Sequence, residues 1–284
     1  MKKILLSFAD KRMKKSLARI KQQAEAMDTY DEIIIANEDD LNPEFREQFK
    51  EKLNSNTRGY GYWCWKPQII LQTLDKMDEG DILQYTDAGC HLNPAGKKRL
   101  DDYFSYCEKS RIGILAFQAK QPEPPFIYDN RPLPDLAEYK WCKADTLNYF
   151  HVLHDKKITE SQSIGAGIFF IKKEKESIKI INQWLQVYEN DFHLLDDSPS
   201  IIENCSGFIE HRHDQSIFAI LCKMNNVKTI SAYEYWYPKI NSSEPDWDSL
   251  IEFPIHAKRD RNLGIHHKLI IKLNRIQKLL MGKK

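Results

Sequence analysis

Long apolar segments are missing from this 284-residue sequence. No stretch reaches the roughly 18 uncharged apolar residues that a membrane-spanning helix needs, and the apolar run that begins at Ile4 ends before Asp10. That run is too short for the core of a signal peptide, and no small-residue cleavage site follows it. The six cysteines never stand in C-x-x-C spacing. We therefore expect reduced thiols in a cytosolic protein and no zinc cluster.

The motifs of several large enzyme classes are missing as well. The sequence holds no G-x-S-x-G, no G-x-x-x-x-G-K-[ST] and no G-x-G-x-x-G. Serine-hydrolase, P-loop and Rossmann-type dinucleotide sites therefore lack their motif. His211 and His213 lie two residues apart, which does not place two ligands on one face of a helix, so a zinc site of the H-E-x-x-H type is excluded.

A near-neutral total hides two parts of opposite charge. The net charge is +1, from 42 Lys and Arg against 41 Asp and Glu. Residues 257–284 hold nine basic residues and one acid, a local net charge of +8, so residues 1–256 carry −7. The tail spaces its apolar residues along one helical face beside a basic stripe, which predicts an amphipathic helix. Such a helix either binds an anionic membrane surface or docks on the protein's own core. The acidic remainder has no basic groove, so we expect no nucleic-acid partner.

Apolar periodicity predicts alternating strands and helices. Strands are expected at 3–8, 32–36, 81–86, 112–117 and 165–171, and helices at 13–27, 43–53, 66–77, 96–109, 174–188 and 213–222. This alternation is typical of an α/β protein whose sheet is covered by helices on both faces. Five prolines between Pro122 and Pro134 predict a long irregular loop, and loops of that kind often carry function.

The predicted strand at 81–86 is followed by Asp87-Ala88-Gly89. Ligands of open α/β sheets bind beyond the carboxyl ends of the strands, and small residues beside an aspartate let a polar ligand approach closely. Asp87 could hold a divalent cation that also binds phosphates, or accept from a sugar hydroxyl. Alternatively, it makes a turn with Gly89.

The segment from Arg58 to Pro67 joins four aromatic residues, two glycines and two cations just before a predicted helix. A helix N-terminus favours anions, and Arg58 and Lys66 could bind a phosphate there. Alternatively, the aromatic residues form a core plug and Lys66 lies in solvent.

The segment from Glu210 to Ser216 places two histidines and two carboxylates at the start of a predicted helix. Asp214 could cap that helix or act as a base that accepts a proton from a hydroxyl nucleophile.

Taken together, residues 58–67, 80–90 and 210–216 resemble a group of bacterial glycosyltransferases found among genes for capsule and lipopolysaccharide O-antigen synthesis. The resemblance runs from about residue 2 to about residue 260. It implies the GT-A fold: one α/β domain over 1–260 with a mixed, mostly parallel central sheet flanked by helices. A donor-nucleotide half would cover about 1–118, an acceptor half about 119–260, and residues 261–284 would form the basic amphipathic tail.

The same resemblance implies an activity. A sugar, expected to be a hexose, would move from a nucleotide-sugar donor, with a UDP-sugar favoured, to a growing lipid-linked cell-surface polysaccharide or O-antigen. The enzyme would be cytoplasmic and peripherally associated with the inner face of the cytoplasmic membrane, held by residues 261–284 on its anionic surface.

Particular residues receive roles from the resemblance. Asp214 stands where inverting enzymes of this fold place the base that activates the acceptor; in a retaining enzyme it would orient substrate instead. The residues expected to contact the donor are Ser7, Phe8, Asp10, Arg58, Tyr62, Lys66, Asp87, Ala88, Gly89 and Arg259, and those on the acceptor side are Gln162, Gly165, Gly167 and His213.

Metal binding is the point where the sequence departs from the family pattern. GT-A enzymes carry a D-x-D motif that binds metal and donor diphosphate, and Asp87-Ala88-Gly89 keeps only one of its two carboxylates. An Mn²⁺ or Mg²⁺ ion would need a second ligand, for which His256 is the candidate. Lys258 or Arg259 could neutralise the diphosphate instead and make a metal dispensable.

Two other functions compete with transfer. The single carboxylate at Asp87 also fits a non-catalytic module that binds a nucleotide sugar or a glycan. A sugar-nucleotide-forming enzyme is the weaker alternative, because the basic, glycine-rich loop expected of pyrophosphorylases does not follow Phe8.

Overall fold

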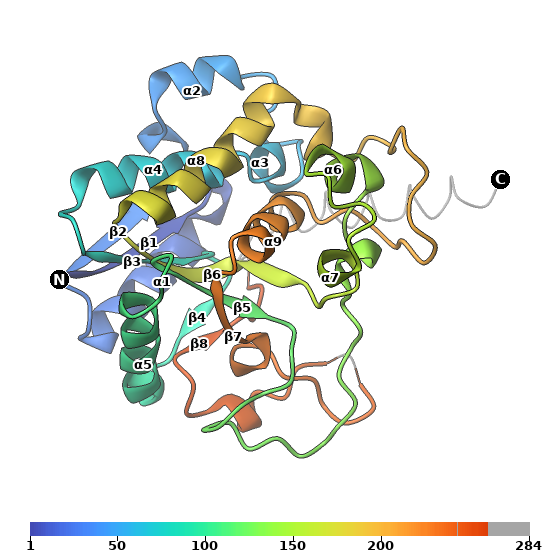
Figure 1. Cartoon of the computed structure of the whole chain (residues 1–284). Coiled ribbons are helices and arrows are strands. Elements are labelled where there is room, and N and C mark those ends of the chain that lie inside the picture. The colour runs from blue at the N-terminus through green and yellow to red at the C-terminus, as the bar shows by residue number, and fades with distance from the viewer. Residues whose placement is uncertain (243, 261–284) are drawn as a thin grey trace.

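The computed structural model describes residues 1–242 and 244–260. The predicted tail helix and the basic stripe of residues 261–284 lie outside these residues. The chain builds one six-stranded sheet with helices packed on both faces (Figure 1). Its strands, in spatial order, are β2 (Glu32–Ala36), β1 (Lys3–Phe8), β3 (Ile82–Thr86), β6 (Ile164–Lys172), β5 (Ile114–Gln118) and β7 (Lys228–Ser231). A separate two-stranded ribbon joins β4 (His91–Leu92) to β8 (Ile255–His256).

All strands of the large sheet except β6 point the same way. The pairs β1–β2, β1–β3 and β5–β7 are parallel, whereas β6 is antiparallel to both of its neighbours. The register pairs Thr86 with Ile168 and Gln118 with Ile164, so β6 begins at the edge where β3 and β5 end. The predicted α/β class, with a mixed, mostly parallel sheet flanked by helices, is confirmed.

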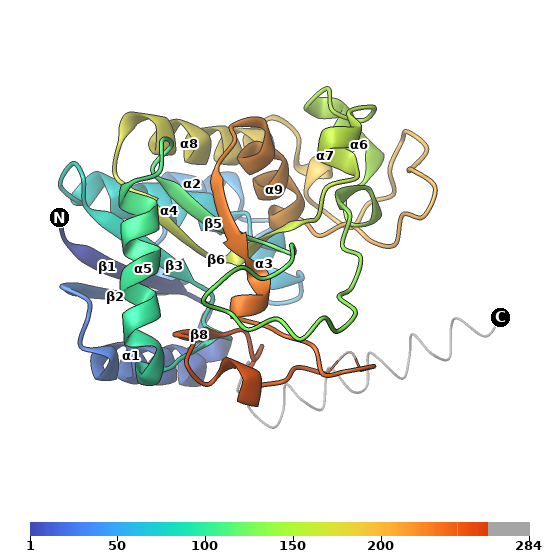
Figure 2. The ribbon, with the colours of Figure 1, turned by 60° about the horizontal axis from the view of Figure 1, so that its bottom comes forward.

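The longer helices divide between the two faces of the sheet (Figures 1 and 2). Helices α1 (Lys14–Met27) and α5 (Lys97–Glu108) cover one face; α4 (Trp65–Lys76), α8 (Lys175–Asn190) and α9 (Asp214–Met224) cover the other. Shorter α-helices are α2 (Pro43–Gln48), α3 (Gly59–Tyr62), α6 (Ala144–Tyr149) and α7 (Lys156–Thr159). Single 3₁₀ turns span Lys11–Met13, Glu38–Asp40, Pro94–Gly96, Glu138–Lys140, Phe192–Leu194, Ala232–Glu234 and Asp248–Leu250.

Alternation along the strands produces two cores. Successive side chains of a strand point to opposite faces, so Phe169 of β6 packs with Trp184 of α8 and Phe218 of α9, whereas Phe170 packs with Phe104 of α5. Strands buried on both faces read as continuous apolar runs, which is why β1 and β6 stood out in the sequence.

The prediction was wrong in detail at several places. The helix expected at 43–53 ends at Gln48, and the strand expected from Ile112 begins at Ile114, because Gly113 has a φ of +66° and interrupts the extended backbone. Helices α3, α6 and α7 and strand β7 were not predicted, since each is too short to show a period. All six cysteines are free thiols, in agreement with the prediction.

Candidate active site

The carboxyl end of β3 and the beginning of β6 bring Asp87 against Gly167. The backbone N–H of Asp87 donates to Gly167 O at 2.8 Å, and the N–H of Cys90 donates to Asp87 O at 2.9 Å, which closes the turn after the strand. A Cβ at position 167 would lie 2.8 Å from Asp87 Oδ2. A side chain at position 167 would therefore have to displace the Asp87 carboxylate.

Lys66 links this carboxylate to a second one from a distant part of the chain. Its Nζ lies 2.6 Å from Asp214 Oδ2, 3.4 Å from Asp87 Oδ1 and 3.0 Å from Ala166 O. The Tyr85 hydroxyl donates to Asp87 Oδ1 at 2.8 Å. The side chains of Lys66 and Asp214 are 2% and 7% exposed, whereas that of Asp87 is 38% exposed. The cluster therefore has a sealed ion pair at its base and a carboxylate that faces outward.

Local structure explains how Lys66 reaches the interior. It is the second residue of α4, and Pro67 follows it in the first turn, where proline's missing N–H costs no hydrogen bond. The preceding residue, Trp65, stacks on Phe8 at the end of β1 with ring centroids 4.0 Å apart. This contact fixes the start of α4 against the sheet. The alternative that placed Lys66 in solvent is wrong.

Asp214 is held at the start of α9. It is the first helical residue, and the N-cap is His213, which has a φ of +53°. The alternative that made Asp214 the helix cap is therefore wrong, and its carboxylate is directed to Lys66 instead. The N-terminus of α9 adds a favourable field for negative charge at this position.

Burial and charge act in opposite directions on the acidity of the pair. Burial raises the pKa of Asp214 to about 6, against the opposing effect of the Lys66 ammonium. Burial lowers the pKa of Lys66, but Asp214 and Asp87 together outweigh it and raise that pKa above its ordinary value. Asp214 thus changes its protonation close to neutral pH beside a permanent cation, a property suited to a group that accepts a proton during a reaction.

A second cluster surrounds His213. The ring Nδ1 donates to Leu195 O at 2.7 Å, and Nε2 lies 3.4 Å from Asp197 Oδ1. Asp197 also lies 3.7 Å from Arg58, and the Tyr62 ring packs on His213 at 5.0 Å. Burial lowers the pKa of His213, so the ring is neutral at physiological pH. Arg58, Tyr62 and His213, predicted from two separate motifs, are therefore brought together beside Asp214.

Ser7, Phe8 and Asp10, which are expected to contact the donor, are all buried. Ser7 and Phe8 lie on β1. The Asp10 carboxylate accepts from Arg12 at 2.6 Å, which pairs it with a cation of its own chain. Their roles in donor binding stay predictions.

Three of the four predicted acceptor residues, Gln162, Gly165 and Gly167, lie on the first part of β6 or just before it. Gln162 precedes the strand, and its Oε1 accepts from the backbone N–H of Leu136 at 2.7 Å. At Gly165, a Cβ would lie 2.5 Å from the Tyr235 hydroxyl, so a side chain there would have to displace that tyrosine. Their contact with an acceptor stays a prediction.

The loop that ends the described chain packs on the Asp87 turn. Arg259 has a φ of +53°, and its Cα lies 3.4 Å from where a Cβ of Gly89 would stand. The N–H of Asp260 donates to Gly89 O at 2.9 Å, and Arg19 donates to Ala88 O at 2.7 Å. Arg259 thus lies next to the predicted diphosphate site.

The residues described around Asp87 offer a divalent metal ion one carboxylate. Mg²⁺ is usually held by one or two carboxylates together with substrate phosphates and water, and the Oδ1 atom of Asp87 is already engaged by Tyr85 and Lys66. His256 Nε2 is hydrogen-bonded to Leu250 O at 2.8 Å, and its ring packs on Trp247. Within the described residues, no group of three or more His, Cys, Asp or Glu side chains could hold a metal ion.

Sequence reasoning missed two contributors to the site. Tyr85 reads as one more apolar residue of a buried strand, and only the structure shows its hydroxyl on Asp87. Arg19 belongs to the exposed-looking side of α1, yet it crosses to the carbonyls of Ala88 and Cys90. Their spacing from Asp87 along the chain carries no signal.

The described residues contain no helix with the length and apolarity needed to cross a membrane. The chain matches no protein-family profile and no curated protein sequence.

Several solved structures resemble the chain at a distance. Mouse xyloside xylosyltransferase 1, in its apo form, is 9% identical, with a TM-score of 0.48 over 90% of this chain and 97% of that one. A glycosyltransferase involved in glycosylating the major capsid of PBCV-1 is 11% identical, with a TM-score of 0.44 over 90% and 94%. A galactosyltransferase in complex with donor and acceptor sugar analogues is 12% identical, with a TM-score of 0.38 over 89% and 86%. Likenesses this distant assign no role to any residue of this chain.

Proposed function

We propose that this chain is a glycosyltransferase that moves a sugar from a nucleotide-sugar donor to a hydroxyl group of a glycan acceptor. The observation that carries the proposal is the meeting of Lys66, Asp87 and Asp214 in one cluster. Each comes from a different one of the three segments on which the family resemblance rests. The cluster lies beyond the carboxyl end of β3, where open α/β sheets bind their ligands.

Asp214 has the properties of the base in such a transfer. In an inverting reaction, the acceptor oxygen would attack the anomeric carbon of the donor sugar. The bond from that carbon to the diphosphate oxygen breaks, the nucleoside diphosphate leaves with the electron pair, and the acceptor proton passes to the Asp214 carboxylate. A buried carboxylate with a pKa of about 6 is ionised at neutral pH and basic enough to accept that proton.

Cations near the cluster suit the leaving group. Arg58, Lys66 and Arg259 come from three parts of the chain, and each carries a positive charge that would stabilise a diphosphate. A UDP-hexose is the donor we favour, on the family resemblance alone. Because Asp87 is a single carboxylate, we favour these protein cations for this task over a divalent metal ion.

For the acceptor and the location, the proposal rests on the family resemblance and on the basic tail. A growing lipid-linked surface polysaccharide or O-antigen would be held at the inner face of the cytoplasmic membrane, and residues 261–284 would bind the anionic surface there.

The alternative is a binding module without turnover. One observation favours it: Lys66 forms an ion pair with Asp214 and contacts Asp87. This charge-balanced cluster would stabilise the fold even if Asp214 took no part in a reaction.

The experiment that tests transfer is the hydrolysis of nucleotide sugars by the purified chain. We expect slow release of the nucleotide from one member of a panel of UDP-, GDP-, CMP- and dTDP-sugars, and loss of that release in Asp214→Asn. Glu210→Gln, which changes an exposed carboxylate of the same segment, is the matched control. No release from any donor, together with unchanged donor binding in Asp87→Ala, would overturn the proposal. Release that persists in Asp214→Asn would overturn the role of the base.

A further inference from the structure

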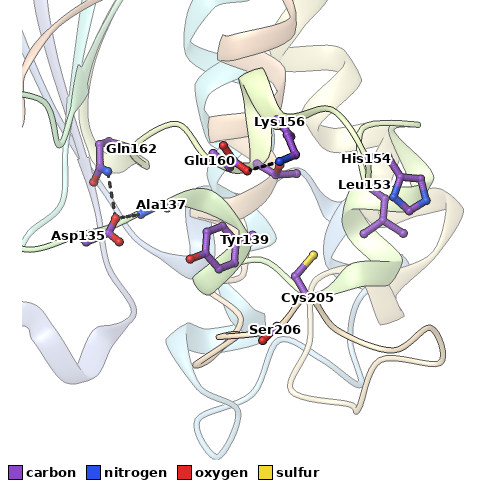
Figure 3. A pocket seen from close by; sticks show the side chains of 11 residues that line it. Asp135, Ala137, Tyr139, Leu153, His154, Lys156, Glu160, Gln162, Cys205 and Ser206 are labelled. Carbon is purple, nitrogen blue, oxygen red and sulfur yellow. Dashed lines mark hydrogen bonds and ion pairs between the residues drawn. The ribbon is translucent and has the colours of Figure 1, made fainter.

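A cavity of about 770 Å³ opens beside the start of β6. Pockets that bind small molecules typically span about 300–1,000 Å³. The walls come from the end of the long loop, the turn at Glu138–Lys140, helix α7 and the loop at 205–206 (Figure 3). None of the roles assigned above uses this cavity, apart from Gln162 on its rim.

The lining combines polar groups with one aromatic face. Figure 3 shows Tyr139 between the Asp135–Gln162 wall and the Cys205–Ser206 wall, with Lys156 and Glu160 above it. A sugar presents hydroxyl groups around its ring edge and an apolar C–H face, which need hydrogen-bonding partners and an aromatic surface respectively.

The hydrogen-bonding capacity of the walls is only partly used. Asp135 accepts from Gln162 Nε2 at 3.1 Å, from Ala137 N at 3.1 Å and from Lys140 Nζ at 2.6 Å. A carboxylate has about four acceptor positions, so one remains for a ligand donor. Glu160 is exposed and lies 3.2 Å from Lys156. Each of the two carboxylates is paired with an ammonium, Asp135 with Lys140 and Glu160 with Lys156, so the wall has no excess charge for an acidic or a basic ligand and suits a neutral one.

The cavity includes Gln162, which lies just before β6, the strand that carries Gly167. Gln162 and Gly167 are five residues apart, about 16 Å in extended backbone, and Gly167 faces Asp87. Gln215, the residue after Asp214, donates to Ser163 Oγ at 3.2 Å. A chain of sugars whose end reaches Asp214 would therefore pass along β6 into the cavity.

We propose that this cavity is a binding site for a neutral oligosaccharide, and that it holds sugars of the acceptor behind the one that reacts. The role in holding the acceptor rests on the proposed transferase function. The binding of an oligosaccharide rests on the cavity alone.

Cys205 supplies a built-in reporter. It lines the cavity and is half-buried, whereas Cys64, Cys90, Cys107, Cys142 and Cys222 are buried. An alkylating reagent such as N-ethylmaleimide should therefore react first at Cys205, and a sugar in the cavity should slow that reaction.

The test begins with an array of neutral and acidic oligosaccharides of two to six units, probed with the full chain. We expect retention of neutral oligosaccharides. Tyr139→Ala should weaken binding at least about tenfold, the loss expected when an aromatic anchor is truncated. Tyr139→Phe, which keeps the ring, should bind, and Tyr149→Ala, an exposed tyrosine on α6 outside the cavity, should behave as the wild type. The glycan that binds best should slow alkylation of Cys205, and UDP should not.

The results of these experiments either support the cavity proposal or overturn it. The cavity proposal is overturned if no oligosaccharide is retained, if only acidic ones are, or if the best ligand leaves Cys205 alkylation unchanged. Equal binding by Tyr139→Ala and the wild type overturns it as well. Protection of Cys205 without donor hydrolysis, and with donor binding unchanged in Asp87→Ala, would support the cavity and overturn the transferase, whereas hydrolysis without glycan binding would do the reverse.

Discussion

Replacement of Lys66 by methionine tests whether the buried cluster is a charge-balanced unit. The change keeps much of the side-chain volume and removes the only cation within hydrogen-bonding distance of Asp214 that the described residues show. Removal of one partner of a buried ion pair typically costs about 3–5 kcal/mol, because the other charge stays buried without compensation. For a chain of this size, each kcal/mol lowers Tm by about 2–4 °C, so we expect Lys66→Met to melt roughly 6–20 °C lower.

A double-mutant cycle separates charge from packing. In Lys66→Met combined with Asp214→Asn, no buried charge is left without a partner, so the double variant should be more stable than Lys66→Met alone. The control is Lys50→Met, whose exposed pair with Glu47 should contribute at most about 1 kcal/mol. Chemical denaturation at pH 7 gives each free energy of unfolding.

The pH dependence adds a second criterion. Without Lys66, the pKa of Asp214 should rise further, so the loss caused by Lys66→Met should shrink as the pH falls from 7 to 5 and Asp214 takes up its proton. Lys66 and Asp214 do not form a charge-balanced unit if Lys66→Met is as stable as Lys50→Met, or if the two changes in the cycle are additive at pH 7.

Four shorter predictions follow from other features of the site. Burial raises the pKa of Asp214 to about 6 in the folded chain. The contribution of Asp214 to the free energy of unfolding is therefore complete below about pH 4 and is lost as the pH rises through 6. Relative to Asp214→Asn, the wild type should lose up to about 3 kcal/mol of stability between pH 4 and pH 7. Donor hydrolysis should rise over the same range with an apparent pKa near 6, and a flat profile would exclude Asp214 as the base. Gly167→Ala should cost about 1–3 kcal/mol by displacing Asp87, whereas Gly89→Ala, whose nearest neighbour would be 3.4 Å away, should cost less in the same denaturation assay. Deletion of residues 262–284 should reduce sedimentation with anionic liposomes without changing hydrolysis of a soluble donor; unchanged sedimentation contradicts a membrane role for the tail.

The fold was predictable where periodicity is strong. Strand β1, helix α1, strand β3 and helix α8 appear close to the expected residues, because each buries one face or both. The direction of β6 could not be read from Ile164–Lys172, since an apolar run carries no information about its neighbours. That direction is nevertheless what sets Gly167 opposite Asp87.

The sequence indicated which residues belong to the site, but not which of them are in contact. Asp87, Lys66 and Asp214 stood out by their positions at a strand end and at two helix starts. Nothing in their spacing indicates that Lys66 Nζ lies within 3.4 Å of both carboxylates, because the distance between residues 66 and 214 depends on how the sheet closes between them. The cavity wall at Tyr139 and Glu160 was missed for another reason: Tyr139 belongs to a turn of three residues, and Glu160 directly follows α7, a helix of four residues.

The position of β6 in the sheet affects how the chain can fold during its synthesis. Strand β3 pairs on one side with β1 and on the other with β6, and β6 leaves the ribosome about eighty residues after β3. Until then, both β3 and β5 present unpaired edges, which are templates for wrong pairing. A fragment ending near residue 118 would keep those edges permanently, so the donor-side half is expected to need the second half in order to fold. Expression of residues 1–118 and 119–284 as separate fragments should therefore give two insoluble proteins rather than two folded domains.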